Sequence, residues 1–253
     1  MRILSLAPSN TEILYALGVE DYVIANTRYC DFPPHAKEKP KIGGWLDVKY
    51  EIISEYHPDV IITSTFVQDK IVARFKMMGI EVFHVDPLTL DDVYDSIIRI
   101  GKLVNKEGKA HIIVGEMKTA LEAIRQEALK LPRLKVYCEE WHKPITVSGN
   151  WVPALIEIAG GNPVLIKEGV HSKEVKSEDV IAANPDVIIV SLCGIGIGAN
   201  IDEIKHREGW NLITAVHDNK VFAINDSLLN RPGPRLVEGA KLLFDLFRGR
   251  TQS

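Results

Sequence analysis

Residues 57–64 read H-P-D-V-I-I-T-S, and residues 184–191 read N-P-D-V-I-I-V-S. An internal match about half a chain apart indicates two similar units in one polypeptide. In each copy a short helical stretch stops at a proline and a β-branched run follows, which is typical of one helix-to-strand step of an α/β unit. A weaker second match follows each copy, at 81–86 and 220–226. The sequence therefore predicts two like α/β lobes, and two lobes create a cleft in which a ligand can bind.

A long helix is predicted between the two lobes. Apolar residues recur at three- and four-residue steps from 107 to 131, and Pro132 follows. This pattern predicts one amphipathic helix of roughly 24 residues, about 36 Å long, which is roughly twice the usual length. We therefore expect an α/β fold with two Rossmann-like lobes, at 1–105 and 133–253, joined by a single long backbone helix at 106–132.

The composition is that of an ordinary globular protein. The chain has 253 residues, of which 46% are hydrophobic and 25% are charged, so it is long enough for two lobes. Its net charge of −4 gives no basic footprint for nucleic acid. No apolar run approaches the roughly 20 residues that a membrane span needs. We expect a monomer with no nucleic-acid partner and no membrane span.

The N-terminal residues do not form a complete export signal. Pro8 and the polar Ser9 cut the apolar stretch too short. The chain as printed therefore predicts a cytoplasmic protein. A chain that starts at a mature N-terminus would look the same, and would then be periplasmic or extracellular and tethered to a membrane.

The three cysteines, Cys30, Cys138 and Cys193, are widely spaced and form no C-x-x-C motif. An odd number at such spacing disfavours a disulfide framework and a structural zinc site. Buried free thiols are the expected state.

Aromatic residues lie in several loops that follow predicted strands. Loops at the carboxyl ends of parallel strands line the ligand crevice of α/β folds, and flat aromatic faces suit a large, partly apolar ring. Trp45 follows two glycines in the irregular stretch 27–45, and loops of this length are usually functional. Trp151 also begins a predicted helix, so packing in the core is the alternative there. The candidate ligand-binding aromatics are Tyr29, Trp45, Phe66, Trp141 and Trp151.

Polar candidates follow the last predicted strand. Asp226 comes first, and Arg231 lies in a loop rich in proline and glycine, where its guanidinium fork could bind a ligand phosphate, carboxylate or amide. Arg235 begins the last helix, and a structural ion pair is its alternative role. No metal ligands are assigned.

Two glutamates occupy equivalent places in the repeat. Glu51 lies seven residues before Pro58, and Glu178 lies seven residues before Pro185. A carboxylate at a helix N-terminus is favoured by the helix dipole, so capping is one interpretation. The other is that each lobe presents one glutamate for docking to a partner.

Three motifs carry a family resemblance: R-I-L-S-L-A-P-S-N-T-E-I-L-Y-A-L-G at 2–18, C-D-F-P-P at 30–34 with G-G-W at 43–45, and R-P-G-P-R-L-V at 231–237. Nearly the whole chain resembles the vitamin B12-binding proteins of ABC importers. They belong to a class of solute-binding proteins, with two lobes joined by one long helix, that also binds iron-siderophore chelates, haem and metal ions. The resemblance implies a protein that binds a corrinoid (cobalamin) or a similar metal chelate and delivers it to an ABC importer. It implies no enzymatic activity and no covalently held cofactor.

The resemblance also assigns roles to single residues. Tyr29, Trp45, Asp226 and Arg231 match positions that hold the vitamin in that family. Glu51 and Glu178 match the two glutamates that dock on arginines of the membrane permease, a role that requires export. Near 171–173 the family carries a tryptophan that this chain lacks, and this difference leaves a siderophore, haem or a metal ion open as the ligand.

Two other functions have some support in the sequence. The stretch G-I-G-I-G-A at 194–199 fits the dinucleotide pattern G-x-G-x-x-A, but it follows the repeated strand rather than the first strand of a unit. Direct metal binding is the other possibility, although the histidines show no short ligand spacing. They are scattered at His84, His142, His171 and His206. The sequence contains no Ser-His-Asp motif, nucleophile elbow or phosphate loop.

Overall fold

The computed structural model describes residues 1–249. The chain divides into two compact units, and the division falls inside one long helix. The first unit consists of Met1–Pro87 and Asp91–Glu116, and the second of Leu88–Leu90 and the chain from Met117 onward. Within residues 1–249, no helix combines the length and the apolar character needed to cross a membrane.

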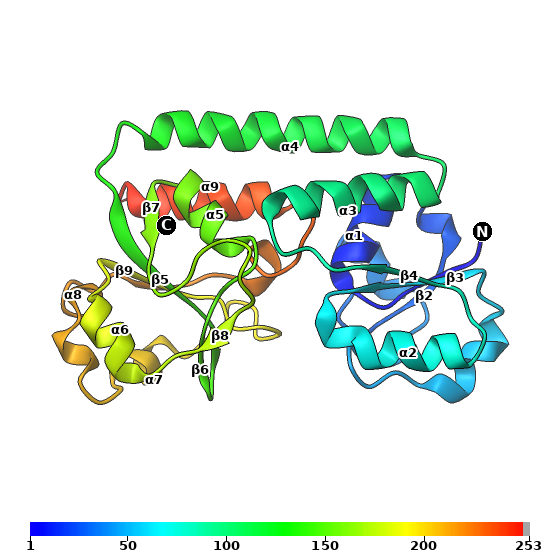
Figure 1. The fold of residues 1–253 in the computed structure, drawn as a ribbon, viewed down its shortest axis with the longest axis horizontal. Coiled ribbons are helices and arrows are strands. Elements are labelled where there is room, and N and C mark those ends of the chain that lie inside the picture. Colours follow the sequence, from blue (N-terminus) through cyan, green and yellow to red (C-terminus); the bar gives the residue numbers. More distant parts are fainter. Residues whose placement is uncertain (250–253) are drawn as a thin grey trace. The chain divides into compact units, whose positions relative to one another are not determined.

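The first unit is built on a four-stranded sheet in the order β2-β1-β3-β4, in which all neighbours are parallel. Parallel strands need crossover connections, and these are supplied by helices. Figure 1 shows α3 above this sheet and α2 below it. The elements are β1 (Ile3–Ser5), α1 (Pro8–Ala16), η1 (Glu20–Tyr22), β2 (Val23–Asn26), η2 (Pro34–Glu38), η3 (Tyr50–Tyr56), β3 (Val60–Ser64), η4 (Phe66–Gln68), α2 (Asp69–Met77), β4 (Val82–Val85) and α3 (Leu90–Leu103), where η denotes a short 3-10 helix.

The strands of the first unit are buried on both faces, as expected for a parallel sheet covered by helices. Leu4 and Ile61 pack on the face that also receives Ile71 and Phe75 of α2. Every residue of β3 is buried, including its last two polar residues. The uninterrupted apolar run of the repeat is therefore a central strand.

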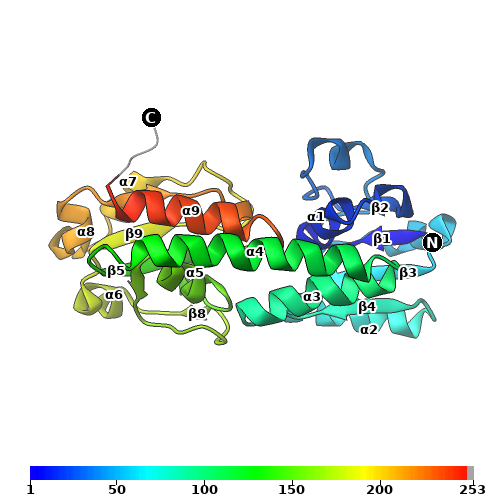
Figure 2. The same cartoon turned by 90° about the horizontal axis from the view of Figure 1, so that it is seen from above.

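Helix α4 (Glu107–Ala128) is continuous and contains the boundary between the units (Figure 2). Its final turn tightens, because the amides of Lys130 and Leu131 bond to carbonyls three residues earlier, at 3.2 and 3.0 Å. Pro132 then prevents further helix. The predicted helix is confirmed, three residues shorter than the apolar periodicity indicated.

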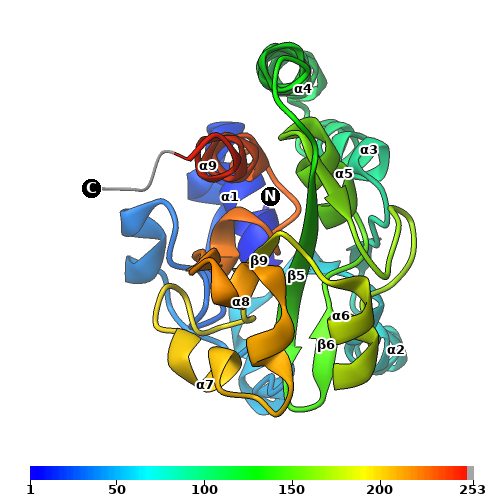
Figure 3. The ribbon, with the colours of Figure 1, turned by 90° about the vertical axis from the view of Figure 1, so that its left-hand side faces the viewer.

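The second unit has a mixed sheet in the order β10-β9-β5-β6-β8, with β7 also paired to β5. The β5, β7, β9 and β10 pairings are parallel, whereas β6 forms antiparallel pairs with β5 and β8. Figure 3 shows β5 running through the middle of this sheet. The elements are β5 (Leu134–His142), β6 (Ile145–Val147), α5 (Val152–Ile158), β7 (Gly161–Pro163), β8 (Lys173–Glu174), α6 (Ser177–Ala183), β9 (Val187–Val190), α7 (Ile201–Lys205), η5 (Trp210–Leu212), α8 (Thr214–His217), β10 (Val221–Ala223), η6 (Asp226–Leu228) and α9 (Leu236–Phe247).

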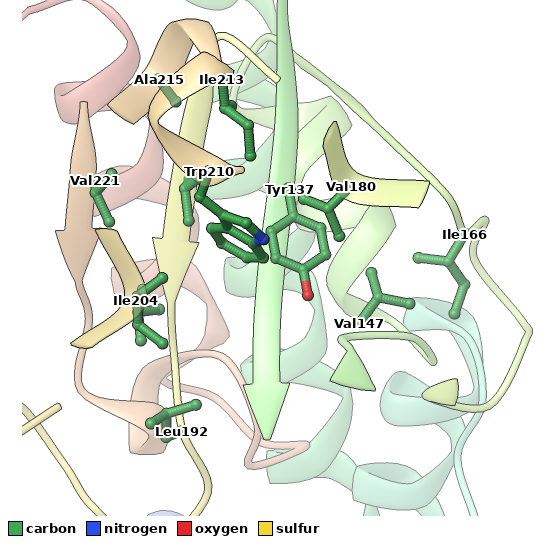
Figure 4. Close-up of a cluster of buried hydrophobic side chains, with 12 residues drawn as sticks. Tyr137, Val147, Ile166, Val180, Leu192, Ile204, Trp210, Ile213, Ala215 and Val221 are labelled. Carbon is green, nitrogen blue, oxygen red and sulfur yellow. The ribbon is translucent and has the colours of Figure 1, made fainter. Parts of the chain in front are cut away.

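Trp210 is the largest fully buried side chain of the second unit (Figure 4). Its ring packs edge-on against Tyr137, with ring centroids 6.1 Å apart, and its indole N–H donates to Ser177 Oγ at 2.6 Å. An edge-to-face pair stabilises the core beyond simple burial, and the hydrogen bond removes the cost of burying the N–H. This core holds β5, β9 and the segment after α7 together.

The repeat extends from sequence to backbone contacts. In the first unit Asp59 Oδ2 accepts the backbone N–H of Arg2 at 2.7 Å, and the Asp59 N–H donates to the Arg2 carbonyl at 2.8 Å. In the second unit Asp186 makes the same two bonds with Lys135, at the same lengths. We call this paired contact the aspartate clamp. Each clamp fixes the repeated strand against its parallel neighbour at the point where both begin.

The helix before each clamp also ends in the same way. His57 and Asn184 both adopt the left-handed conformation, with φ of 43° and 44°. A left-handed residue ends a helix and turns the chain, and the following proline cannot continue it. The predicted helix at 48–56 is a 3-10 helix, η3, whereas its counterpart α6 is an α-helix.

Candidate functional site

The carboxyl ends of the first unit's strands are held together by one buried side chain, Gln68. Its Nε2 donates to the carbonyls of Leu6 and Trp45, at 3.0 and 2.8 Å, and its Oε1 accepts the N–H of Ser64 at 2.8 Å. The two sheet contacts come from the ends of β1 and β3, and the third comes from the loop that carries Trp45. Gln68 therefore anchors that loop to the end of the sheet. The sequence prediction missed this residue.

The loop around Trp45 owes its shape to Gly43. Gly43 has φ of 115°, and a Cβ at this position would lie 2.3 Å from the Asp47 carbonyl oxygen. Arg28 closes the loop, because its guanidinium forms an ion pair with Asp47 at 2.6 Å and lies over the Tyr29 ring at 5.3 Å from the centroid. Tyr29 and Trp45 are therefore positioned by one connected set of contacts.

Two aromatic residues of this edge are open to solvent. Tyr29 is 43% exposed and Phe66 is 46% exposed, whereas Trp45 is partly buried. Phe66 is oriented by its backbone N–H, which donates to Asp86 Oδ1 at 2.9 Å. Exposed aromatic rings on anchored loops are a ready surface for an apolar ligand.

Polar atoms without partners lie among these aromatics. Within residues 1–249, Trp45 Nε1, Ser64 Oγ and Thr65 Oγ1 are buried and make no hydrogen bond. Thr65 also has φ of 65°, which is unfavourable for a β-branched residue. Strain and unpaired polar groups are both typical of ligand-binding positions.

In the second unit, Asp226 organises a glycine loop. Its two carboxylate oxygens accept the N–H groups of Gly194 and Gly196, each at 2.9 Å. Both glycines are left-handed, with φ of 77° and 65°. These are the amides that would cradle a phosphate in a dinucleotide fingerprint, and an internal carboxylate already occupies them. The G-I-G-I-G-A stretch is thus a structural loop that displays Ile195 and Ile197, both exposed.

The end of β5 carries a second polar group that the sequence prediction missed. Ser172 Oγ donates to Glu140 Oε2 at 2.5 Å, and Cys193 Sγ approaches Glu140 Oε1 at 3.7 Å. Asn230 Nδ2 donates to the Ser191 carbonyl at 2.8 Å and contacts Cys193 Sγ at 3.2 Å. Burial raises the pKa of Glu140, although Ser172 and Cys193 oppose the shift. We call Glu140, Ser172, Cys193 and Asn230 the Glu140 cluster.

The remaining candidates of the second unit have different surroundings. Trp141 is exposed, and its indole N–H donates to the Lys143 carbonyl at 3.0 Å. Trp151 is only 2% exposed, and its N–H donates to the Leu229 carbonyl at 2.8 Å, a placement that favours core packing. Arg231 and Arg235 are both partly buried.

The two docking candidates, Glu51 in η3 and Glu178 in α6, are both exposed. Neither forms a hydrogen bond or an ion pair with another of the described residues. Asp179 rather than Glu178 caps α6, since its carboxylate accepts the Lys176 N–H at 3.1 Å. Capping is therefore not what Glu178 does.

The surroundings of the cysteines and histidines bear on thiol pairing and on metal binding. Within residues 1–249 all three cysteines are free, with Cys30 and Cys138 buried and Cys193 partly exposed. The same residues contain no group of three or more histidine, cysteine, aspartate or glutamate side chains arranged to hold a metal ion. His84, for example, bonds through Nδ1 to Thr63 Oγ1 at 2.8 Å.

Known proteins resemble this chain along nearly its whole length. An uncharacterised ABC transporter substrate-binding lipoprotein of Bacillus subtilis is 29% identical over 259 residues, covering 96% of this chain and 78% of that protein. A vitamin B12-binding protein of Vibrio parahaemolyticus is 27% identical over 239 residues, covering 93% and 85%.

A solved structure agrees with these relatives. A possible iron-binding, periplasmic solute-binding protein of Staphylococcus epidermidis is 30% identical, with a TM-score of 0.81 and 97% of each chain covered. The family model described as periplasmic binding protein matches residues 3–228. This match covers most of the chain and both α/β units, and it shows that the chain belongs to the periplasmic binding protein family.

Proposed function

We propose that this protein binds a corrinoid, cobalamin or a close analogue, and passes it to an ABC importer. The observation that carries the proposal is the anchored aromatic edge of the first unit, where Trp45, Tyr29 and Phe66 lie on loops fixed by Gln68 and Arg28. Broad aromatic faces suit the large, partly apolar corrin ring. The vitamin B12-binding relative supports this ligand class.

The assignment of contacting residues follows from the same edge. Tyr29, Trp45 and Phe66 contact the ring, and Trp141 and Arg231 are the accessible candidates of the second unit. Asp226 is only 8% exposed and holds its glycine loop through both carboxylate oxygens, so in this proposal its role is to shape that loop. Binding and release involve no bond-making step, so no catalytic residue is assigned.

Calorimetric titration of cyanocobalamin tests the proposal. Wild type should bind at ligand concentrations up to about 100 μM, and Trp45→Ala should weaken binding at least about tenfold, because it removes both a stacking face and buried area. Tyr22→Ala is a matched control, since Tyr22 lies outside the edge, in η1. No binding by wild type would exclude cobalamin, and equal affinities of wild type and Trp45→Ala would place the ligand elsewhere.

An iron chelate or haem is the second candidate, because the Staphylococcus epidermidis relative is described as possibly iron-binding. Parallel titrations with haemin and with a ferric siderophore decide between the two. Tight binding of either, together with no cobalamin binding, would support this alternative.

A further inference from the structure

The Glu140 cluster has no partner for its negative charge. Among the described residues, Glu140 forms no ion pair, and its hydrogen-bond partners are the Ser172 hydroxyl and the Cys193 thiol. A partly buried carboxylate without a cation depends on hydrogen-bond donors instead, and the two Glu140 oxygens can accept more bonds than the one that each receives. Burial first, and then Glu140, also raise the pKa of Cys193, so this thiol stays protonated and can donate.

Two buried oxygen atoms near Glu140 can accept hydrogen bonds but receive none. Asn230 Nδ2 already donates to the Ser191 carbonyl, which fixes the orientation of the amide and leaves Asn230 Oδ1 as a buried acceptor without a partner. Ser191 Oγ, which is fully buried, also lacks a partner among residues 1–249. Glu140 adds a carboxylate to these groups, so together they present three side chains that can accept hydrogen bonds.

We infer that the Glu140 cluster is a ligand subsite that accepts N–H hydrogen bonds from an uncharged group, namely a primary carboxamide at the rim of the bound corrinoid. The inference rests on the proposed function and specifies which groups of the ligand the second unit reads. A corrinamide donates from its NH2 to Glu140 and to Asn230 Oδ1. A ligand carboxylate at the same place would bring a second negative charge beside Glu140 and would have no N–H to donate.

This arrangement predicts chemical selectivity within one ring system. Dicyanocobinamide carries carboxamides around the corrin, whereas dicyanocobyrinic acid carries carboxylates at those positions. Buried polar groups reject an analogue that leaves them unpaired far more strongly than apolar contacts do. Wild type should therefore bind the amide form at least about tenfold more tightly than the acid form.

Calorimetry with both compounds on Glu140→Gln tests the role of the cluster. The substitution keeps the shape of the side chain and removes the charge, so the acid-to-amide ratio of dissociation constants should fall at least about tenfold. Glu174→Gln, an exposed position on β8, makes the same charge change away from the cluster and should leave the ratio unaltered. Because the ratio compares two ligands on one variant, a general loss of folded protein cannot produce it.

A second variant gives an independent measurement. Asn230→Ala removes the unpaired Oδ1 acceptor, so it should weaken the binding of dicyanocobinamide more than that of dicyanocobyrinic acid. Thermal unfolding should show that Glu140→Gln and Asn230→Ala both remain folded.

The outcomes separate this inference from the proposed function. A reduced acid-to-amide ratio in both variants supports the subsite. Dicyanocobinamide binding with an unchanged ratio in Glu140→Gln or in Asn230→Ala overturns the subsite and leaves the proposed function standing. Failure of wild type to bind any corrinoid overturns both.

Discussion

At the scale of single residues, the most consequential buried contact is the ion pair between Arg207 and Glu139. Two guanidinium nitrogens donate to the two carboxylate oxygens at 2.6 and 2.7 Å, and the Glu139 side chain is fully buried. The Tyr137 hydroxyl also donates to Glu139 at 3.1 Å, and Arg207 stacks over Trp210 at 4.6 Å from the ring centroid. One charged pair therefore joins β5 to the segment after α7.

Removing the Arg207 cation should strongly destabilise the fold. Arg207→Ala leaves the Glu139 carboxylate buried and unpaired, so we expect the free energy of unfolding to fall by about 3–5 kcal/mol in urea titrations. Lys143→Ala is the control, because it breaks an exposed ion pair with Glu203 and should cost less than about 1 kcal/mol. Adding Glu139→Gln to Arg207→Ala should recover part of the loss. Similar losses for Arg207→Ala and Lys143→Ala would show that the pair contributes little.

Residues of this kind show where sequence reasoning stops. Trp45 and Tyr29 could be predicted as candidate site residues because aromatic side chains in irregular loops stand out locally. Gln68 could not, since its role depends on backbone groups at Leu6, Trp45 and Ser64 that only the fold brings together. Glu140 was missed for a related reason, because a charged residue near a strand end looks like an ordinary surface residue.

At the scale of secondary-structure elements, the aspartate clamp is the contact that both units share. Asp59 and Asp186 each place one carboxylate oxygen 2.7 Å from the backbone N–H of the neighbouring strand. In both units the repeated sequence therefore holds the first residues of two parallel strands in register.

Asp59→Ala and Asp186→Ala should each lower the free energy of unfolding by about 1–2 kcal/mol, because each loses a hydrogen bond to a charged acceptor. Asparagine at either position keeps an acceptor oxygen and should lose less. Asp95→Ala, which removes an exposed helix pair with Arg99 at 3.9 Å, should change stability by less than about 0.5 kcal/mol. If only one of the two substitutions lowered the free energy of unfolding, the two clamps would share their geometry but not their contribution to stability.

Elements were easier to predict than their ends. The repeat and the apolar periodicity indicated the central strands and α4, since both patterns are long and regular. The antiparallel strands β6 and β8 were not predicted, because they contain only three and two residues. The 3-10 form of η3 was not predicted either, since its sequence pattern fits one kind of helix as well as the other.

At the scale of the whole molecule, the hypothesis to test is that Glu51 and Glu178 dock the protein on an ABC permease. Glu51 and Glu178 are exposed and have no partner among the described residues. Glu51→Lys and Glu178→Lys should each weaken binding to the permease, and more strongly at low salt, because screening weakens exposed charge pairs. Surface plasmon resonance against the permease complex at two salt concentrations measures both effects.

Glu55→Lys is the matched control for this prediction, since Glu55 is exposed in the same short helix, η3. It makes the same change in net charge four residues away and should have a smaller effect. Ligand affinity should remain unchanged in all three variants. Equal losses for Glu51→Lys and Glu55→Lys would point to overall charge rather than to a specific docking residue.

The aspartate clamp also shows what the two units have in common and where they differ. The two stretches share their sequence, their left-handed helix ends and their paired backbone bonds, as expected of an internal repeat. The two copies differ where β5 runs on into the β6 hairpin, an extension that the sheet of the first unit lacks. Glu140 lies on that extension. The first unit therefore has the clamp but no counterpart of the Glu140 carboxylate, so the two units share what holds their strands in register and differ in the chemistry at the strand ends.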